Sequence, residues 1–464
     1  IAYKLFSNCT GLEKITIPDT VTTIKGNAFY ECSNLAKIKL SENLTVIEAD
    51  AFQECNSLQN IELPEGLSEI KDRAFYQCSN LKEIKIPDSV TKIEGSAFYE
   101  CKKLQNVTLS KNLESLGSST FGNCDGLTQI EIPKSLERAG DDYFASYAPG
   151  AFSGCKNLKN VSFEAGTTVI AYKLFSNCTG LEKITIPDTV TTIKGYAFYE
   201  CSNLKEIQIG NGLKEIGDSV FYECTSLQKV LFPDTVSSMG TNIFYNCINL
   251  TEVHLPNIRQ NIMANTFYNC KKLTTINFPS TLTTIGDSAF SGCESLLEAV
   301  LPSGVERIES NAFKNCKSLK KAVVPDTVSS IGSSAFYGCE ALTDITLGSK
   351  LKKIDSQTFY GCAALPSIMI PYNVTAIGDS AFVNCTKLTQ ITVPRNTTSI
   401  ASNAFSYPKK MTMYGPSGCY AQTYANGKGI KYVAQDIHAT SISLDVTNKT
   451  AERYDRFQLT AAIT

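Results

Sequence analysis

The chain has 464 residues, of which 43% are hydrophobic and 19% charged, and its formal net charge is −2. This composition is typical of a folded protein and excludes a disordered or fibrous chain. The near-neutral charge indicates neither a nucleic-acid partner nor an anionic membrane surface, and no apolar run approaches the roughly 20 residues that span a bilayer. The sequence starts without Met, inside a repeat and without a signal peptide, so we expect a fragment or a processed form.

Cysteines recur at a fixed spacing along most of the chain. Every step from Cys9 to Cys385 is 23 residues, except for a step of 31 residues between Cys124 and Cys155. Of the eighteen cysteines, only Cys419 falls outside this series. A constant period of roughly 20–29 residues is the signature of leucine-rich repeats. The sequence therefore predicts an α/β leucine-rich-repeat solenoid of about 17 repeats over residues 1–407.

One repeat unit starts at Leu81 and reads L-K-E-I-K-I-P-D-S-V-T-K-I-E-G-S-A-F-Y-E-C. The segment L-x-x-I-x-I alternates and is rich in β-branched residues, which predicts a short strand that ends at Pro87 because proline has no N–H. Strands of successive repeats should pair in parallel, about 4.8 Å apart, on the concave face. The segment G-S-A-F-Y-E-C is expected to form one helical or 3-10 turn outside, anchored by Ala97 and Phe98.

Two regions depart from the repeat. The 31-residue step contains an insertion at about 141–149, D-D-Y-F-A-S-Y-A-P, which should bulge from the surface without breaking the stack. Residues 408–435 are predicted to form a strand, a short helix closed by glycine and a further strand, which together would cap the end of the solenoid. Residues 436–464 are predicted to hold a linker and the first two strands of an incomplete domain.

The unit C-x-x-L-x-x-I-x-I-P-x-x-V-x-x-I-x-x-x-A-F resembles the BspA-like, or Treponema-type, leucine-rich repeats of bacterial surface proteins over about 1–407. Residues 408–435 are similar to the usual C-terminal cap of that family, and A-T-S-I-S-L-D-V-T is similar to the start of a bacterial immunoglobulin-like domain. The resemblance implies a secreted or cell-surface protein of host-associated bacteria, some of which bind host matrix or other cells. It implies no catalytic residues.

The repeat cysteines could in principle form disulfides between neighbouring repeats. Each has two equivalent neighbours, however, and parallel stacked side chains do not offer the roughly 90° torsion of a disulfide. Because a free cysteine is a good small buried hydrophobe, we expect a ladder of buried thiols.

The sequence indicates no catalytic centre, no metal site and no cofactor. The cysteine spacing lacks the close pairs of zinc sites, and the only two histidines, His254 and His438, are too far apart in sequence to suggest a nucleophile–base pair. Carboxylates such as Glu62 and Glu131 should point outward among lysines, and we interpret them as cross-strand charge pairs on a solvated face rather than as an acid–base pair.

The residues two and four positions after each repeat leucine should face the concave side. The second of these is polar through the N-terminal half and later becomes apolar or aromatic at several repeats, which suggests a partner site. The alternative is that β-branched residues simply favour strands, or that the C-terminal domain covers them. This candidate surface comprises Leu231, His254, Val300, Val323 and Met369.

The insertion offers a second candidate surface, since aromatic residues on exposed loops are common in interfaces. It holds Tyr143, Phe144 and Tyr147 within a few residues of one another. The alternative is that these rings fold back against the flank of the solenoid.

Together these features predict an extracellular or cell-surface binding scaffold, adhesin-like rather than enzymatic, that uses its concave sheet. Its partner would be a host matrix or cell-surface protein or a glycan, with no role for nucleic acid. Two alternatives remain open: a structural spacer that displays another domain, or an accessory region of a larger secreted enzyme.

Overall fold

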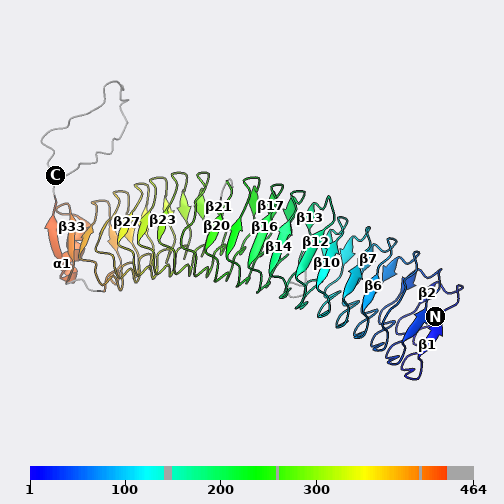
Figure 1. Cartoon of the computed structure of the whole chain (residues 1–464). Coiled ribbons are helices and arrows are strands. Elements are labelled where there is room, and N and C mark those ends of the chain that lie inside the picture. The colour runs from blue at the N-terminus through cyan, green and yellow to red at the C-terminus, as the bar shows by residue number, and fades with distance from the viewer. Residues whose placement is uncertain (141–148, 258–260, 407–409, 436–464) are drawn as a thin grey trace.

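The computed structural model describes residues 1–140, 149–257, 261–406 and 410–435. It is a solenoid in which one coil of chain stacks on the next from the N-terminus to the C-terminus, and the array bends gently along its length (Figure 1). The predicted leucine-rich-repeat solenoid with parallel strands is confirmed.

The L-x-x-I-x-I segment forms the first strand of the repeat, as predicted, and these strands pair in parallel and in register. We call them the first sheet, although breaks divide it into shorter sheets. Its strands are β1 (Lys14–Thr16), β3 (Lys37–Lys39), β6 (Glu83–Lys85), β8 (Asn106–Thr108), β10 (Gln129–Ile132), β12 (Asn160–Phe163), β14 (Lys183–Ile186), β16 (Glu206–Ile209), β18 (Lys229–Leu231), β20 (Glu252–His254), β23 (Glu298–Val300), β25 (Lys321–Val323), β27 (Asp344–Thr346), β29 (Ser367–Met369) and β31 (Gln390–Thr392).

A second, very short strand follows the turn after the L-x-x-I-x-I segment in each repeat, and the sequence analysis did not predict it. It covers only two residues, the second of which is in most repeats a buried aliphatic residue of the V-x-x-I segment. These strands form the second sheet: β2 (Thr23–Ile24), β4 (Val46–Ile47), β5 (Glu69–Ile70), β7 (Lys92–Ile93), β9 (Ser115–Leu116), β11 (Arg138–Ala139), β13 (Val169–Ile170), β15 (Thr192–Ile193), β17 (Glu215–Ile216), β19 (Ser238–Met239), β21 (Asn261–Ile262), β22 (Thr284–Ile285), β24 (Arg307–Ile308), β26 (Ser330–Ile331), β28 (Lys353–Ile354), β30 (Ala376–Ile377) and β32 (Ser399–Ile400).

The outer segment of the repeat is a run of turns, so the expectation of a helical or 3-10 turn there is wrong. Ser96 and Glu100 have φ of 53° and 56°, whereas both kinds of helix need negative φ. The backbone N–H groups of Ser96, Phe98 and Glu100 donate to carbonyls of the next repeat, each at 2.8 Å. Because these bonds run between repeats and not within a helix, the outer edge adds a third line of contacts to the stack.

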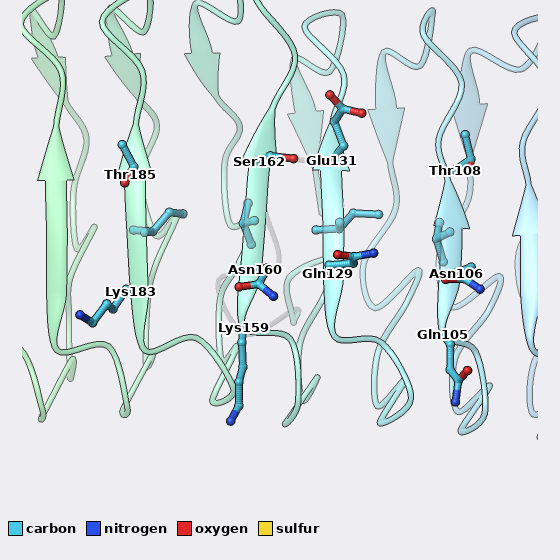
Figure 2. A pocket seen from close by; sticks show the side chains of 14 residues that line it. Gln105, Asn106, Thr108, Gln129, Glu131, Lys159, Asn160, Ser162, Lys183 and Thr185 are labelled. Atoms are coloured by element: carbon cyan, nitrogen blue, oxygen red, sulfur yellow. The ribbon is translucent and has the colours of Figure 1, made fainter.

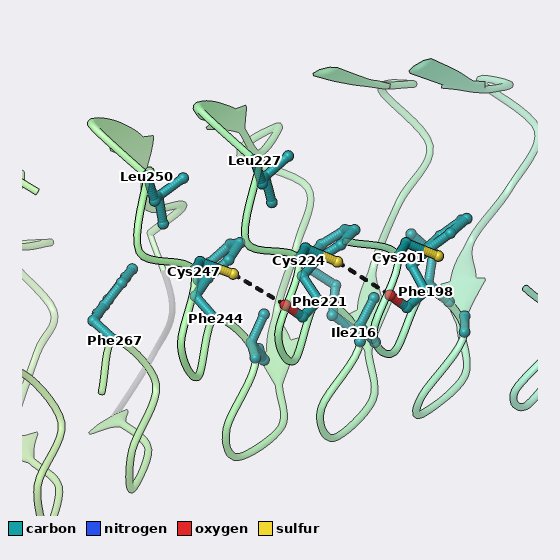
Figure 3. Close-up of a cluster of buried hydrophobic side chains, with 14 of the residues drawn as sticks. Phe198, Cys201, Ile216, Phe221, Cys224, Leu227, Phe244, Cys247, Leu250 and Phe267 are labelled. Carbon is teal, nitrogen blue, oxygen red and sulfur yellow. Dashed lines mark hydrogen bonds between the residues drawn. The ribbon is translucent and has the colours of Figure 1, made fainter. Parts of the chain in front are cut away.

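The core is a row of stacked phenylalanines beside a row of cysteines. From Phe6 to Phe405 one phenylalanine per repeat stacks on the next, with ring centroids 5.1 to 5.8 Å apart. The thiol of each repeat cysteine lies beside this row, and Figure 3 shows Cys224 and Cys247 donating to the carbonyls of Phe198 and Phe221 at 3.1 and 3.0 Å. All cysteines are free and all but Cys9 are buried, which confirms the predicted thiol ladder.

The stack continues past the insertion, but one sheet does not. Phe121 stacks on Phe152 at 5.4 Å, and β10 pairs with β12 over four residues. The second sheet, by contrast, ends at β11 and starts again at β13. The insertion therefore leaves the core and the first sheet intact, as expected, while it coincides with an interruption of the second sheet.

The strand, helix and strand expected after the repeats are present. They are β33 (Thr412–Gly415), α1 (Tyr420–Lys428) and β34 (Lys431–Ala434), and β33 and β34 extend the first sheet beyond β31. The helix ends at Lys428 and is capped by Gly429, whose φ of 67° is a left-handed conformation that glycine adopts without strain. In the described part of the chain no helix has the length and apolar character needed to cross a bilayer. The expected immunoglobulin-like strands in 436–464 lie outside the described residues.

Candidate binding face

The first sheet has one buried side and one solvent-facing side. In β18, for example, Val230 points into the core while Lys229 and Leu231 on either side of it are exposed. The same alternation recurs along the first sheet, because successive side chains of a strand point to opposite sides. We call the outward side chains, two and four residues after each repeat leucine, the first-sheet face.

Part of the first-sheet face consists of charge pairs between neighbouring strands. Lys183 Nζ lies 3.1 Å from a carboxylate oxygen of Glu206, and Lys229 Nζ lies 2.9 Å from one of Glu252. All four side chains are well exposed, so each pair contributes at most about 1 kcal/mol to stability. This agrees with the interpretation of these charges as a solvated face.

The predicted apolar candidates lie on this face but do not form one continuous patch. Leu231, Val300 and Met369 are 48%, 49% and 72% exposed. His254 is exposed beside Leu231 on the neighbouring strand, with Nε2 3.9 Å from a carboxylate oxygen of Asp234. Val323 is directly opposite Val300 and is only partly exposed.

These candidates occupy three separate places along the face. Polar Asn277 and Thr346 lie at the equivalent positions between them. The Asn277 side-chain amide accepts a hydrogen bond from the N–H of Leu255 and donates one to its carbonyl, each at 3.1 Å. Tyr372, 63% exposed in the turn after β29, adds an aromatic ring close in sequence to Met369. The face therefore offers three small apolar sites spaced along the array.

The aromatic candidates of the insertion, Tyr143, Phe144 and Tyr147, lie outside the described residues. Their role stays a prediction.

A hollow in the N-terminal half of the face was not predicted. It spans β8, β10, β12 and β14 and has a volume of about 660 Å³. Its side chains are mainly uncharged and polar (Figure 2). The sequence does carry a pattern that could have revealed it: the position two residues after the leucine, charged in many repeats, is an amide in three successive repeats. We call this feature the amide hollow and define it by Gln105, Asn106, Gln129, Asn160, Thr108 and Ser162.

The described residues offer little for catalysis or metal binding. Burial raises the pKa of the Cys78 thiol to about 12 and that of Cys32 to about 11, so at neutral pH both are protonated and poor nucleophiles. Within the described ranges no three His, Cys, Asp or Glu side chains gather as a metal site would require. The polar surface of the first sheet is suited to binding, since its groups are held on a rigid frame and point outward.

Fold and face together define a leucine-rich-repeat solenoid. Its sequence matches the family profile described as BspA type leucine rich repeat region (6 copies), over residues 1–102, 32–151, 146–248, 192–320 and 306–420. The chain therefore belongs to the BspA-type leucine-rich repeat family, whose repeats are typically non-enzymatic scaffolds.

The chain is similar to solved structures of bacterial proteins. A leucine-rich repeat protein from Bacteroides ovatus is 28% identical, with a TM-score of 0.57 over 82% of this chain and 87% of that one. A leucine rich cell surface protein from Faecalibacterium prausnitzii is 27% identical over 77% and 85% of the two chains, with a TM-score of 0.38. The T. pallidum leucine rich repeat protein is 24% identical over 45% and 78%, with a TM-score of 0.27. No curated protein matches the chain.

Proposed function

We propose that the chain is an extracellular or cell-surface binding scaffold, adhesin-like in action, that engages a partner protein through its first-sheet face. The observation that carries this proposal is the exposure of Leu231, Val300 and Met369 at positions where the pleat points to solvent. The location outside the cell rests on the resemblance to BspA-like surface proteins.

The physical argument concerns the cost of leaving these side chains in water. A strand stabilises the solenoid through its inward residues, so its outward positions are free to be polar, as most of them are. Burying the exposed surface of Val300 and Met369 against a partner would gain roughly 25 cal/mol for each Å² of apolar area. The flexible Met369 side chain also adapts to an irregular partner surface. Three apolar sites along a rigid array favour an extended partner that touches the face at intervals.

We expect the double substitution Val300→Lys and Met369→Lys to weaken partner binding at least about tenfold, because a lysine ammonium would have to be desolvated in the interface. Val323 is the poorer choice, since it is partly buried. Binding would be measured by surface plasmon resonance against the matrix protein or mucin that captures the intact chain.

The matched control places the same two lysines on the second sheet. Ser238 and Ser399 are exposed and lie in the same array, and replacing both by lysine adds the same charge. This control should bind as the wild type does, and both variants should keep the wild-type circular dichroism spectrum. Equal binding by the Val300/Met369 variant would refute this part of the face as the partner site.

A further inference from the structure

The amide hollow lies on strands that the partner site does not use. Figure 2 shows the side chains of Asn106, Gln129 and Asn160 side by side across β8, β10 and β12, at the same height along the strands. Gln129 and Asn160 are direct register partners in the parallel pair β10–β12. The paired strands β10 and β12 thus present two successive amides about 4.8 Å apart, whereas Asn106 on β8 lies across a break in the sheet.

These amides are not used to hold the protein together. Within the described residues, the side chains of Gln105, Asn106, Gln129 and Asn160 make no hydrogen bond, although all four are held on strands or at their edges. Further along the same face, the equivalent positions of β14 and β16 are joined by the Lys183–Glu206 ion pair. A run of three unengaged amides is therefore a local change in the chemistry of the face.

The centre of the amide hollow has no free positive charge. Two lysines lie at its edge, but Lys183 pairs with Glu206 at 3.1 Å and Lys159 lies 3.9 Å from Glu182. Both carboxylates lie outside the lining of the hollow. Glu182 also lies 2.9 Å from Lys205, so it compensates Lys159 only in part. Because both lysines lie at the edge and the Glu131 carboxylate lies on the rim, the centre of the hollow suits an uncharged ligand better than an anionic one.

The hollow also coincides with two breaks in the first sheet. β8 and β10 belong to separate sheets, and so do β12 and β14. Between the amides, Val107 and Val161 are only partly buried and give the floor an apolar component. The surface therefore combines donors, acceptors and exposed C–H groups within about 660 Å³, a volume in the range of small-ligand sites.

We propose that the amide hollow binds an uncharged oligosaccharide. Each amide has two N–H donors and a carbonyl acceptor, which matches sugar hydroxyls because these both donate and accept. The apolar floor can contact the C–H face of a sugar ring, and the row of amides across three strands suits a chain of sugar units. This inference rests on the proposed use of the first-sheet face for binding, but it concerns other strands and another ligand.

The test uses the full chain and a printed array of neutral and acidic glycans, followed by isothermal titration with a neutral oligosaccharide that binds. The variant Gln129→Ala with Asn160→Ala removes one register pair of amides. The matched control, Ser367→Ala with Gln390→Ala, removes a register pair at the same positions of β29 and β31, outside the hollow. We expect the hollow variant to bind about tenfold more weakly and the control to bind like the wild type. The affinity should be equal at low and high salt, because no ion pair is involved.

Binding to acidic glycans alone, to no neutral glycan on the array, or equally by variant and wild type would overturn the inference. Capture of an uncharged peptide in place of any glycan would overturn it as well. The outcome is separate from that of the partner-site test, since the Val300/Met369 variant leaves the hollow intact and the Gln129/Asn160 variant leaves the partner site intact.

Discussion

Replacing Phe221 by alanine should destabilise the centre of the array by about 3–5 kcal/mol. Phe221 is fully buried and stacks on Phe198 and Phe244, with ring centroids 5.7 and 5.6 Å apart. A cavity there removes contacts on both sides, and the neighbouring rings cannot close it because each is held by the next phenylalanine. Since stability in a solenoid is a sum of nearest-neighbour terms, the loss should be local.

Hydrogen exchange followed by mass spectrometry measures this locality directly. We expect faster exchange in the repeats around residues 198–247 and unchanged exchange near both ends. The control is Leu231→Ala in the next repeat, which truncates a half-exposed side chain and should change the free energy of opening by no more than about 0.5 kcal/mol. Equal effects of the two substitutions, or faster exchange along the whole chain, would contradict a core built from stacked neighbours.

Raising the pH should unfold the protein through its buried thiols. Burial raises the pKa of Cys78 and of Cys385 to about 12 from an ordinary value of 9.0. Between these values the unfolded chain loses protons that the folded chain keeps, so the stability present below pH 9.0 falls as the pH rises towards the folded pKa. Each such thiol should contribute about 1.4 kcal/mol per pH unit, and the ladder contains many of them.

The measurement is urea unfolding from about pH 8 to about pH 10.5, where the expected slope is steep. Tyrosines such as Tyr222, whose pKa burial raises to about 12, act in the same direction, so the thiol share must be isolated. Above the ordinary thiol pKa of 9.0, the slope of the variant Cys78→Ala should be shallower by up to about 1.4 kcal/mol per pH unit, even though the variant is less stable at neutral pH. A profile that stays flat to the highest pH, or an unchanged slope in the variant, would argue against buried thiols.

The sequence alone was sufficient to predict the repeat, the first strand and the thiol ladder. Their apolar positions recur at nearly every 23-residue step, so the same pattern is observed in many repeats and cannot arise by chance. The second strand was missed because two residues are too few to show alternation. The outer turns were assigned wrongly because A-F-Y resembles a helical face, while the evidence against a helix lay in its neighbours: the position two residues after the phenylalanine is glycine with positive φ in several repeats, including Gly292 and Gly338.

Burial depended on context that no single repeat contains. Residues 1–35 and 170–204 are identical except for Asn27 and Tyr196, yet Leu5 is 54% exposed and Leu174 only 1%. Leu174 has a repeat packed on both of its sides, whereas Leu5 has one in this chain. The substitution of Tyr196 for Asn27 also changes a contact: Lys173 is buried, and its ammonium lies 5.6 Å from the centre of the Tyr196 ring. Such effects arise from stacking and not from local sequence.

The candidate site was predicted in part. Alternation along the strand was enough to place Leu231, Val300 and Met369 in solvent, because the direction of a side chain follows from the pleat. It did not show that Val323 is partly covered, or that polar residues separate the apolar sites. The amides of the hollow could have been found, because they recur at one position in three successive repeats. The breaks between β8 and β10 and between β12 and β14, with which the hollow coincides, are not encoded in the repeat pattern.

The most direct test of the central claim is a binding screen of the intact chain against matrix proteins, mucin and glycans, carried out in parallel with the Val300/Met369 lysine variant. A binding scaffold should capture at least one protein from these classes with an affinity that the lysine variant loses and the second-sheet control keeps. If the wild-type chain binds nothing in any class, the solenoid is better explained as a spacer. If all three proteins bind a protein partner alike, the apolar part of the first-sheet face is not the partner site.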